Sequence, residues 1–441
     1  MRLVMCILLG LLSVGASLAQ DTKDDDIVVV TGKVIDQKSN KSLNNVSIYV
    51  PNTNIGTVSN ADGVFTLKIN RSIIKSGLKA EYPGYHSSVI DSKMISDAAN
   101  RYVTISMLSS ARTLKEVVVR SGNPKEIVCA ALKKIPDNYS ADKNLFSAFY
   151  RETIQKGRRF VGVSEAVLDV YKTPYSRRIT YGDKVQVMKG RKLLSQKSSD
   201  TLAVKIAGGP TLPIILDFVK NEDFLFSESE LDLYEFKMER PTSIDDKLQY
   251  VIYFKPKAKV DYALCEGKLF IDQETLSFSR AEFSVDMSDK DKATKAILRK
   301  KPRGLHFKPQ EISFVISYKD YNGKTYLNYV SSKSRFKCDW KKRLFSSGYT
   351  TYTEMVMVDR TDNPSAGISG KFAFSKNDIF DDKVGHYWDV DFWRDYNIIE
   401  PTESLEKAVD RLKYNGGHQL SLTNPVEHDD YVSMNDKQSF Q

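Results

Sequence analysis

The stretch "VVVTGKVIDQKSNKSLNNVSIYVPNTNIGTVSNADGVFTLKI", Val28 to Ile69, decides the fold of the N-terminal part of this 441-residue chain. Apolar residues recur at every second position within 28–34, 46–50 and 65–69. A period of two places alternate side chains on opposite faces of a strand, so these segments predict β-strands. With a further strand over 103–107, they predict a small β-sandwich spanning residues 28–108.

Four motifs in this region carry a family resemblance. They are Thr31 to Asp36, Leu43 to Val50, Gly56 to Phe65, and Pro83-Gly84-Tyr85. Together they resemble the carboxypeptidase regulatory-like domain, a transthyretin-like sandwich that is common in exported proteins of the Bacteroidetes. The resemblance implies an accessory fold that brings no catalytic residues of its own.

The turn before the third of these strands has the sequence Asn60-Ala61-Asp62-Gly63. Gly63 can adopt the positive φ of a tight turn, and Asp62 can bond to the local backbone. The oxygens of Asn60 and Asp62 could instead bind calcium, but that ion takes about six to eight oxygen ligands. We therefore favour turn chemistry.

The N-terminus reads as a secretory signal peptide over residues 1–19. Arg2 precedes an apolar run from Leu3 to Leu12, and Ser17-Leu18-Ala19 is a small-residue cleavage site. The run has 10 residues, whereas a membrane-spanning helix needs about 20. We expect an exported protein with no transmembrane segment, located in the periplasm, associated with the outer membrane or on the cell surface. Cys6 lies within the apolar run and would be removed with it.

The chain is basic, with a formal charge of +9 that becomes +8 without Arg2. The polyanions outside the inner membrane are lipopolysaccharide, acidic glycans and headgroups, so no nucleic-acid partner is predicted. The lysines are spread along the sequence, which favours a solvated surface. Cys129, Cys265 and Cys338 show no metal-binding spacing, and we favour free thiols over a Cys265–Cys338 bridge.

Beyond the sandwich we expect a linker over 109–123, a β-rich α+β domain over 124–415 and a flexible tail over 416–441. The linker contains "LKEVVV", which is similar to a segment of large outer-membrane receptors with this N-terminal domain. A barrel of about 22 strands does not fit into the residues after Pro124, so that class is rejected. The predicted fold class is mainly β, a transthyretin/Ig-like sandwich followed by a larger antiparallel domain with a few helices.

Local signals place several elements in the larger domain. Asn123 caps a helix that begins at Pro124, and Asn322-Gly323 favours a type I′ hairpin. A second helix begins after Thr402 and has one apolar face, formed by Leu405, Ala408, Val409 and Leu412.

Two further resemblances concern this domain. Residues 124–175 resemble uncharacterised Bacteroidetes proteins of the same domain order, through Ile135 to Tyr139, Phe149 to Glu152, and Ser164 to Val167. The segment Phe270 to Phe283 resembles a strand-turn-strand of outer-membrane lipoprotein carriers, whose curved sheet encloses an apolar cavity.

Enzyme motifs are missing from the sequence. None of the five histidines, His86, His306, His386, His418 and His428, has a glutamate at the spacing of a zinc peptidase. Gly162-Val163-Ser164-Glu165-Ala166 lacks the last glycine of a hydrolase elbow and reads as a strand. Phosphate loops, dinucleotide fingerprints and EF-hands are also missing, so no cofactor, no metal and no catalytic residue is predicted.

The remaining candidate ligand-binding residues are Tyr387, Trp388, Asp389, Asp391 and Trp393. Paired carboxylates beside aromatic rings could bind a sugar or hydrolyse a glycosidic bond. We favour aromatic packing against the last helix, with solvated acids. The basic segment Ile297 to Pro309 could contact an anionic outer-membrane surface, although Pro302, Gly304 and Pro309 favour a loop.

These observations favour a non-catalytic exported envelope protein that binds a partner protein, a glycan or another envelope component. A lipid or lipoprotein carrier with a cavity in its curved sheet is the alternative. A hydrolase that uses carboxylates outside any known motif is the third hypothesis.

Overall fold

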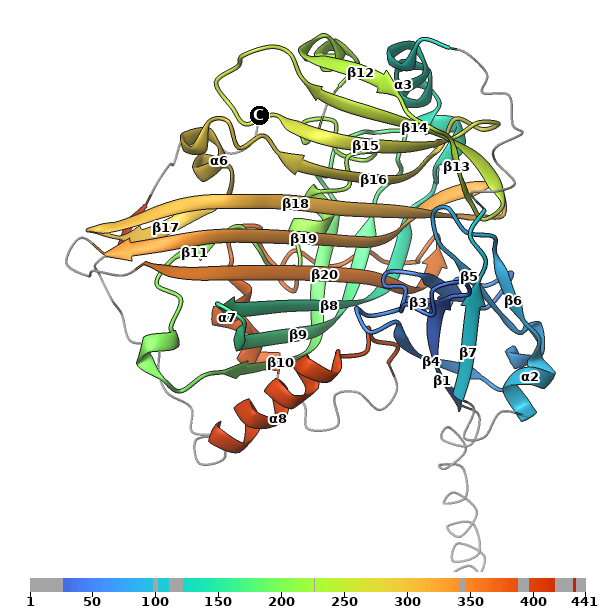
Figure 1. Ribbon diagram of the computed structural model, residues 1–441, viewed down its shortest axis with the longest axis horizontal. Coiled ribbons are helices and arrows are strands. Elements are labelled where there is room, and N and C mark those ends of the chain that lie inside the picture. Colours follow the sequence, from blue (N-terminus) through green and yellow to red (C-terminus); the bar gives the residue numbers. More distant parts are fainter. Residues whose placement is uncertain are drawn as a thin grey trace, which may run out of the picture.

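The computed structural model describes residues 27–97, 102–110, 122–225, 227–340, 346–387, 396–416 and 431–433. Two β units make up nearly all of it, and a few short helices pack around them (Figure 1). The predicted fold class is therefore confirmed. Within these residues, no helix has both the length and the apolar character needed to cross a membrane.

The N-terminal unit is a sandwich of two sheets. One sheet has the order β4-β1-β7 and the other β3-β2-β5-β6. The strands are β1 (Ile27–Asp36), β2 (Ser47–Tyr49), β3 (Gly56–Val58), β4 (Val64–Asn70), β5 (Leu78–Glu81), β6 (Ser88–Ile90) and β7 (Tyr102–Met107). A 3-10 turn, η1 (Ile74–Ser76), and a short helix, α2 (Ser92–Asp97), connect them. Inward residues at every second position, such as Val28, Val30 and Val34, are fully buried between the sheets.

The larger unit is built on an 11-stranded antiparallel sheet, in the order β10-β9-β8-β20-β19-β18-β16-β15-β14-β12, with β13 also pairing β14. Its strands are β8 (Asn144–Lys156), β9 (Arg159–Lys172), β10 (Lys184–Leu194), β12 (Tyr234–Met238), β13 (Thr242–Ile244), β14 (Lys247–Pro256), β15 (Cys265–Asp272), β16 (Phe278–Val285), β18 (Leu305–Tyr321), β19 (Lys324–Trp340) and β20 (Ser347–Asp362). Register shifts interrupt several pairs, including β18 with β19 and β20 with β8. Such bulges bend a strand and increase its twist.

The two faces of this sheet have different neighbours. The inner face carries the main core, in which Phe314, Ile316 and Tyr318 of β18 alternate with outward-facing Ser313 and Ser317. Short helices and loops cover the inner face: α3 (Pro124–Lys133), α4 (Ile135–Asn138), α5 (Leu212–Ile215), α7 (Phe380–Lys383), and the 3-10 turns η4 (Ser198–Asp200), η5 (Glu228–Leu233) and η6 (Val384–Tyr387). The outer face receives the sandwich at one end and α8 (Glu403–Gly416) across β9 and β10 (Figure 1).

The inner face is filled by side chains of the protein itself. Residues 212–225 contribute Ile214, Leu216, Phe218, Val219 and Leu225, all buried in the main core. Phe218 packs edge-on against Phe278 at 5.2 Å and against Tyr318 at 5.9 Å between ring centroids. This side of the sheet is therefore packed like a protein interior.

Several local predictions are confirmed. Asn123 accepts a hydrogen bond from the Lys125 amide, and Thr402 accepts one from the Leu405 amide, so both helices have their expected caps. Asn322 and Gly323 both have positive φ, as a type I′ turn requires. Asn60, rather than Asp62, closes its turn by accepting from the amides of Asp62 and Val64.

The loop predicted for Ile297 to Pro309 is wrong. These residues run from the end of α6 (Lys290–Ile297) through β17 (Leu298–Pro302) and a turn into the start of β18, and β17 pairs with other strands than β18. Pro302 ends its strand and Pro309 sits at a register shift, which are the positions where a strand tolerates proline. Gly304, at φ +78°, makes the turn between them.

The far end of the chain adds a further strand. β21 (Tyr431–Ser433) pairs with β17, which also pairs with β11 (Lys205–Ile206). It lies within the predicted tail, and the residues on either side of it lie outside the described part. Cys265 and Cys338 are buried free thiols, and Cys129 is a half-buried one.

Candidate binding site at the seam between the two domains

The sandwich and the outer face of the large sheet share a small apolar core, which we call the seam core. Val58 of β3 packs there with Phe149, Tyr329, Val356 and Val358 of the sheet and with Ile399 from the segment before α8. All six side chains are buried. The seam core therefore fixes both domains and the segment 396–401 to one another.

Hydrogen bonds across the seam run mainly from side chains to backbone. Asn60 donates to the carbonyls of Glu400 and Pro401, and Thr57 donates to that of Ile398. Asn397 makes two bonds with the Lys68 backbone, accepting from its amide at 2.6 Å and donating to its carbonyl at 3.1 Å. Because backbone groups do not change rotamer, these bonds set a single docking geometry.

A buried charge network lies under the same segment. Arg151 Nε is 2.7 Å from Glu165, its Nη1 is 3.1 Å from Glu354, and its Nη2 donates to the Ile399 carbonyl. Arg191 contacts the other oxygen of Glu165. Burial raises the pKa of Glu354, while Arg151 and Arg191 outweigh the effect of burial and lower the pKa of Glu165. The network is compensated internally and closed to solvent.

A second group of ionisable residues lies where β18 meets the sandwich. Tyr49 donates to Glu81 at 3.0 Å, and Lys319 Nζ lies 3.4 Å from the centroid of the Tyr49 ring. Lys79 forms an ion pair with Asp245 beside them. Burial, and to a smaller extent nearby Asp245, raises the pKa of Glu81 to about 7, while Lys319 opposes the shift. Burial lowers the pKa of Lys319.

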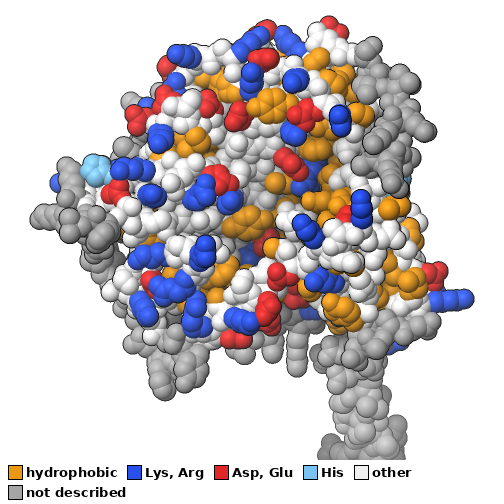
Figure 2. All heavy atoms as spheres, in the orientation of Figure 1, with side chains coloured by type: hydrophobic (Ala, Val, Ile, Leu, Met, Phe, Trp, Pro, Cys, Tyr) orange, Lys and Arg blue, Asp and Glu red, His pale blue; other side chains and the backbone are white. Residues whose placement is uncertain are grey.

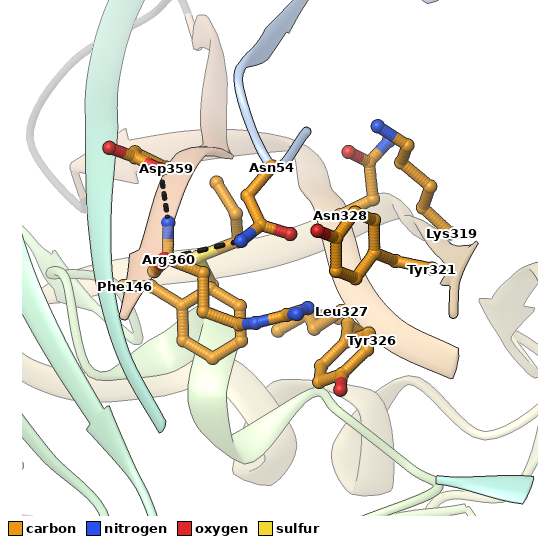
Figure 3. Close-up of a pocket in the computed structure, with 10 residues that line it drawn as sticks. Asn54, Phe146, Lys319, Tyr321, Tyr326, Leu327, Asn328, Asp359 and Arg360 are labelled. Carbon is orange, nitrogen blue, oxygen red and sulfur yellow. Dashed lines mark hydrogen bonds between the residues drawn. The ribbon is translucent and has the colours of Figure 1, made fainter. Parts of the chain in front are cut away.

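Next to Lys319 a small pocket opens at the seam (Figure 3). Arg360 is its central residue, with the guanidinium 3.3 Å from the ring centroid of Tyr326 and 5.1 Å from that of Tyr321. Asn54, from the sandwich, donates to the Arg360 carbonyl at 3.2 Å. The complete lining is Asn54, Phe146, Lys319, Tyr321, Tyr326, Leu327, Asn328, Met357, Asp359 and Arg360.

The pocket can hold only a small group. Its volume is about 30 Å³, whereas sites for drug-sized ligands measure about 300 to 1,000 Å³. Its lining combines two cations, two amides and two phenol rings, which can bind a carboxylate or a hydroxyl presented by a larger partner. The surrounding face is hollowed beside the sandwich (Figure 2).

A larger hollow of about 630 Å³ lies beside Lys237 to Pro241, but a single stretch of five residues lines it. A buried cluster on the inner face is also closed. There Asp217 accepts from Lys172, Tyr175 and Tyr318 at 2.7 to 2.8 Å, and none of these four residues is more than 5% exposed. Burial raises the pKa of both tyrosines well above the usual value. This cluster anchors residues 212–220 to the sheet.

The site predicted from sequence is only partly visible. Tyr387 ends η6, is half-buried and packs against the main core. Trp388, Asp389, Asp391 and Trp393 lie outside the described residues. Within the described part, no group of three or more His, Cys, Asp or Glu side chains is placed to hold a metal ion.

The seam residues were missed by sequence reasoning. Asn54 and Arg360 are 306 positions apart, so no local motif links them. The motifs Phe149 to Glu152 and Ser164 to Val167 contain two residues of the buried charge network. Arg151 of the first motif lies opposite Glu165 of the second in the β8–β9 register. Charged residues inside two strands with apolar neighbours were the signal that could have identified the buried network.

Comparisons with solved structures find distant matches that each cover about half of the chain. An outer-membrane lipoprotein-sorting protein domain from Vibrio parahaemolyticus is 12% identical, with 56% of this chain and 94% of that one covered and a TM-score of 0.25. A LolA superfamily protein from Nitrosomonas europaea is 14% identical, with 56% and 97% covered and a TM-score of 0.19. No curated protein sequence matches the chain.

The sequence model of one family matches the N-terminal part. The model describes the CarboxypepD_reg-like domain, and residues 30–119 match it. The match covers the sandwich described above, including the strands that form its core and the β3 strand that docks on the large sheet. Residues 30–119 of this chain are therefore a CarboxypepD_reg-like domain, and a larger β-rich domain follows them.

Proposed function

We propose that the chain is a non-catalytic, exported envelope protein that binds a partner at the seam between its two domains. The observation that carries the proposal is the Arg360 pocket, whose lining comes from both domains. A site assembled from two domains requires their fixed docking, and the seam core and the Asn60 and Asn397 bonds provide it.

The size of the pocket favours a protein partner over a free small molecule. A volume of about 30 Å³ admits one side-chain carboxylate or hydroxyl but no sugar ring. Lys319 and Arg360 contribute two positive charges to the lining and Asp359 one negative charge, but Asp362 already pairs with Arg360 through two hydrogen bonds. A hydroxyl or an amide of a partner side chain therefore suits the pocket as well as a carboxylate does. A glycan would have to bind over the hollowed face and insert only a hydroxyl.

Binding to solubilised envelope components tests this proposal. The immobilised full-length protein is compared with an N54A/R360M variant and with an N44A/N377A control, in which two exposed asparagines are replaced. We expect one protein to be retained by the wild type and the control and to be lost from the seam variant. Equal retention by all three would place the binding surface elsewhere.

Hydrolysis is the competing outcome. The same preparation is incubated with envelope glycans and with peptides, next to D389N and D391N variants. Turnover by the wild type that either substitution abolishes would replace the binding proposal with the carboxylate-hydrolase hypothesis.

Lipid carriage would require space for an acyl chain on the inner face of the large sheet. An acyl chain on the inner face would have to displace Phe218 and its neighbours, which fill that face in the main core. Native mass spectrometry of protein purified from its own envelope distinguishes the two functions. A co-purified lipid would favour carriage, and lipid-free protein would favour seam binding.

A further inference from the structure

One end of the large sheet concentrates positive charge. Residues 293–310 contain six cations, Lys295, Arg299, Lys300, Lys301, Arg303 and Lys308, and neither Asp nor Glu. They run from α6 through β17 into β18, so β17, the turn after it and the start of β18 carry most of them. We call residues 298–309, together with Lys337 on the adjoining end of β19, the basic tip.

Like charges lie side by side at the basic tip. Lys308 is directly opposite Lys337 in the β18–β19 register, and Lys300 is opposite Lys205 in the β17–β11 register. Like charges opposite one another destabilise a sheet. Asp339 pairs with Lys308 and Asp382 with Lys205, but no described carboxylate forms an ion pair with Lys300, Arg303 or Lys337.

The basic tip is exposed and rigidly supported. Arg299, Lys300, Arg303, Lys308 and Lys337 are all exposed. Phe307, at the start of β18, packs against Phe336 at 4.8 Å between ring centroids, and Phe336 stacks on Tyr349 at 5.9 Å. Lys and Arg side chains gather at this end of the molecule (Figure 2), the end at which β17 and β18 meet in Figure 1.

We infer that the basic tip docks on a lipid surface that bears phosphate headgroups. Its cations lie along an exposed stretch of strand and turn rather than around a cavity, so they suit a broad array of phosphates and not one enclosed anion. Each cation near an anionic membrane contributes about 1 kcal/mol. Docking here leaves the seam at the opposite end of the β18 strand free, because Lys319 and Tyr321 are at the far end of that strand.

Vesicle co-sedimentation tests this inference with the full-length protein. One set of vesicles is pure phosphatidylcholine, and the other contains equal parts of phosphatidylcholine and phosphatidylglycerol. We expect binding only to the anionic set and release as the salt rises from about 0.1 M to about 1 M, which shortens the Debye length from about 10 Å to about 3 Å. Equal binding to both sets, or no binding, would overturn the inference.

A matched pair of triple variants locates the surface. K300Q/R303Q/K337Q removes three exposed cations of the basic tip, and K38Q/K41Q/K93Q removes three from the sandwich, so the net charge falls equally. We expect the tip variant to bind anionic vesicles about 10- to 100-fold more weakly and the control to bind within about threefold of the wild type. Equal losses would mean that net charge alone drives binding.

An acidic polysaccharide serves as competitor. If it displaces the protein at lower anion concentration than added phosphatidylglycerol vesicles do, the partner is a glycan and the lipid inference fails. The inference rests on the exported location in the proposed function but not on the seam, so this assay and the retention assay fail independently.

Discussion

Arg151 shows what one buried residue contributes to this molecule. It is 2% exposed and neutralises Glu165 and Glu354 while it holds the Ile399 carbonyl. Arg151→Met would leave two buried carboxylates with less positive charge beside them, so we expect the free energy of unfolding to fall by about 3–5 kcal/mol. Urea denaturation measures the loss. Lys407→Ala, which removes an exposed helix pair with Glu403, should leave the midpoint unchanged.

A triple variant separates charge from packing at the same place. If uncompensated carboxylates are the cause, R151M/E165Q/E354Q should recover much of the stability that R151M loses, since it removes both of them. The recovery should be incomplete, because Arg191 loses its ion pair with Glu165. A triple variant that is less stable than R151M would instead assign the loss to the shape and hydrogen bonds of the arginine.

Glu81 makes stability depend on pH. Its pKa rises from 4.5 to about 7 on folding, mainly because it is buried. A raised carboxyl pKa stabilises the folded state fully below about pH 4.5, and that contribution is lost as the pH rises through about 7. Glu81→Gln cannot ionise, so the stability of the variant relative to the wild type should increase by about 1–3 kcal/mol between these pH values.

Melting temperatures of the wild type and E81Q, measured from pH 4.5 to pH 8, test this prediction. The side chains that face Glu81 are Tyr49, Lys79, Asp245 and Lys319. A constant difference between the two proteins across this range would show that Glu81 titrates with an ordinary pKa.

The helix α8 depends on a residue of the other domain. Asp62 of the sandwich accepts a hydrogen bond from the Glu403 amide at 2.8 Å, within the first turn of α8. Asp62→Ala should destabilise that turn by about 1 kcal/mol and increase hydrogen exchange of the Glu403 to Leu405 amides. Asp62→Asn keeps an acceptor oxygen, so the Glu403 to Leu405 amides of this variant should exchange at nearly the wild-type rate. Equal exchange in all three proteins would show that Thr402 alone caps the helix.

Elements with local signals were predictable from the sequence, and the seam was not. Helix caps and tight turns each depend on a few neighbouring residues, so they can be recognised in the sequence. The caps at Asn123 and Thr402 and the turn at Asn322-Gly323 are examples. The strands within 298–309 were missed because the prolines of this segment signal a break unless the strand end and the register shift are known. The Arg360 pocket needs residues from β18, β19, β20 and the sandwich, and the order of strands in the sheet is not encoded locally.

The docking of the two domains decides whether the whole molecule unfolds in one step. The three tryptophans, Trp340, Trp388 and Trp393, all follow the sandwich in sequence, so their fluorescence reports only on the larger domain. Far-UV circular dichroism reports on both domains. We expect the two urea transitions to coincide in the wild type, because the seam core and its hydrogen bonds couple the domains.

The N60A/N397A variant should separate those transitions. It removes four hydrogen bonds across the seam, each worth about 1 kcal/mol net, together with the two that close the Asn60 turn, and leaves the seam core in place. The circular dichroism transition should then begin at lower urea than the fluorescence transition, because the sandwich buries less apolar surface and unfolds first once it is released. N397A alone, which removes only the two bonds to Lys68, should separate the transitions in the same order if the seam is the cause. The N44A/N377A control, with one exposed asparagine replaced in each domain, should keep the transitions together. Coincident transitions in N60A/N397A would mean that the apolar contacts of Val58 and Ile399 suffice for coupling, and the hydrogen bonds would then serve only to set the docking geometry.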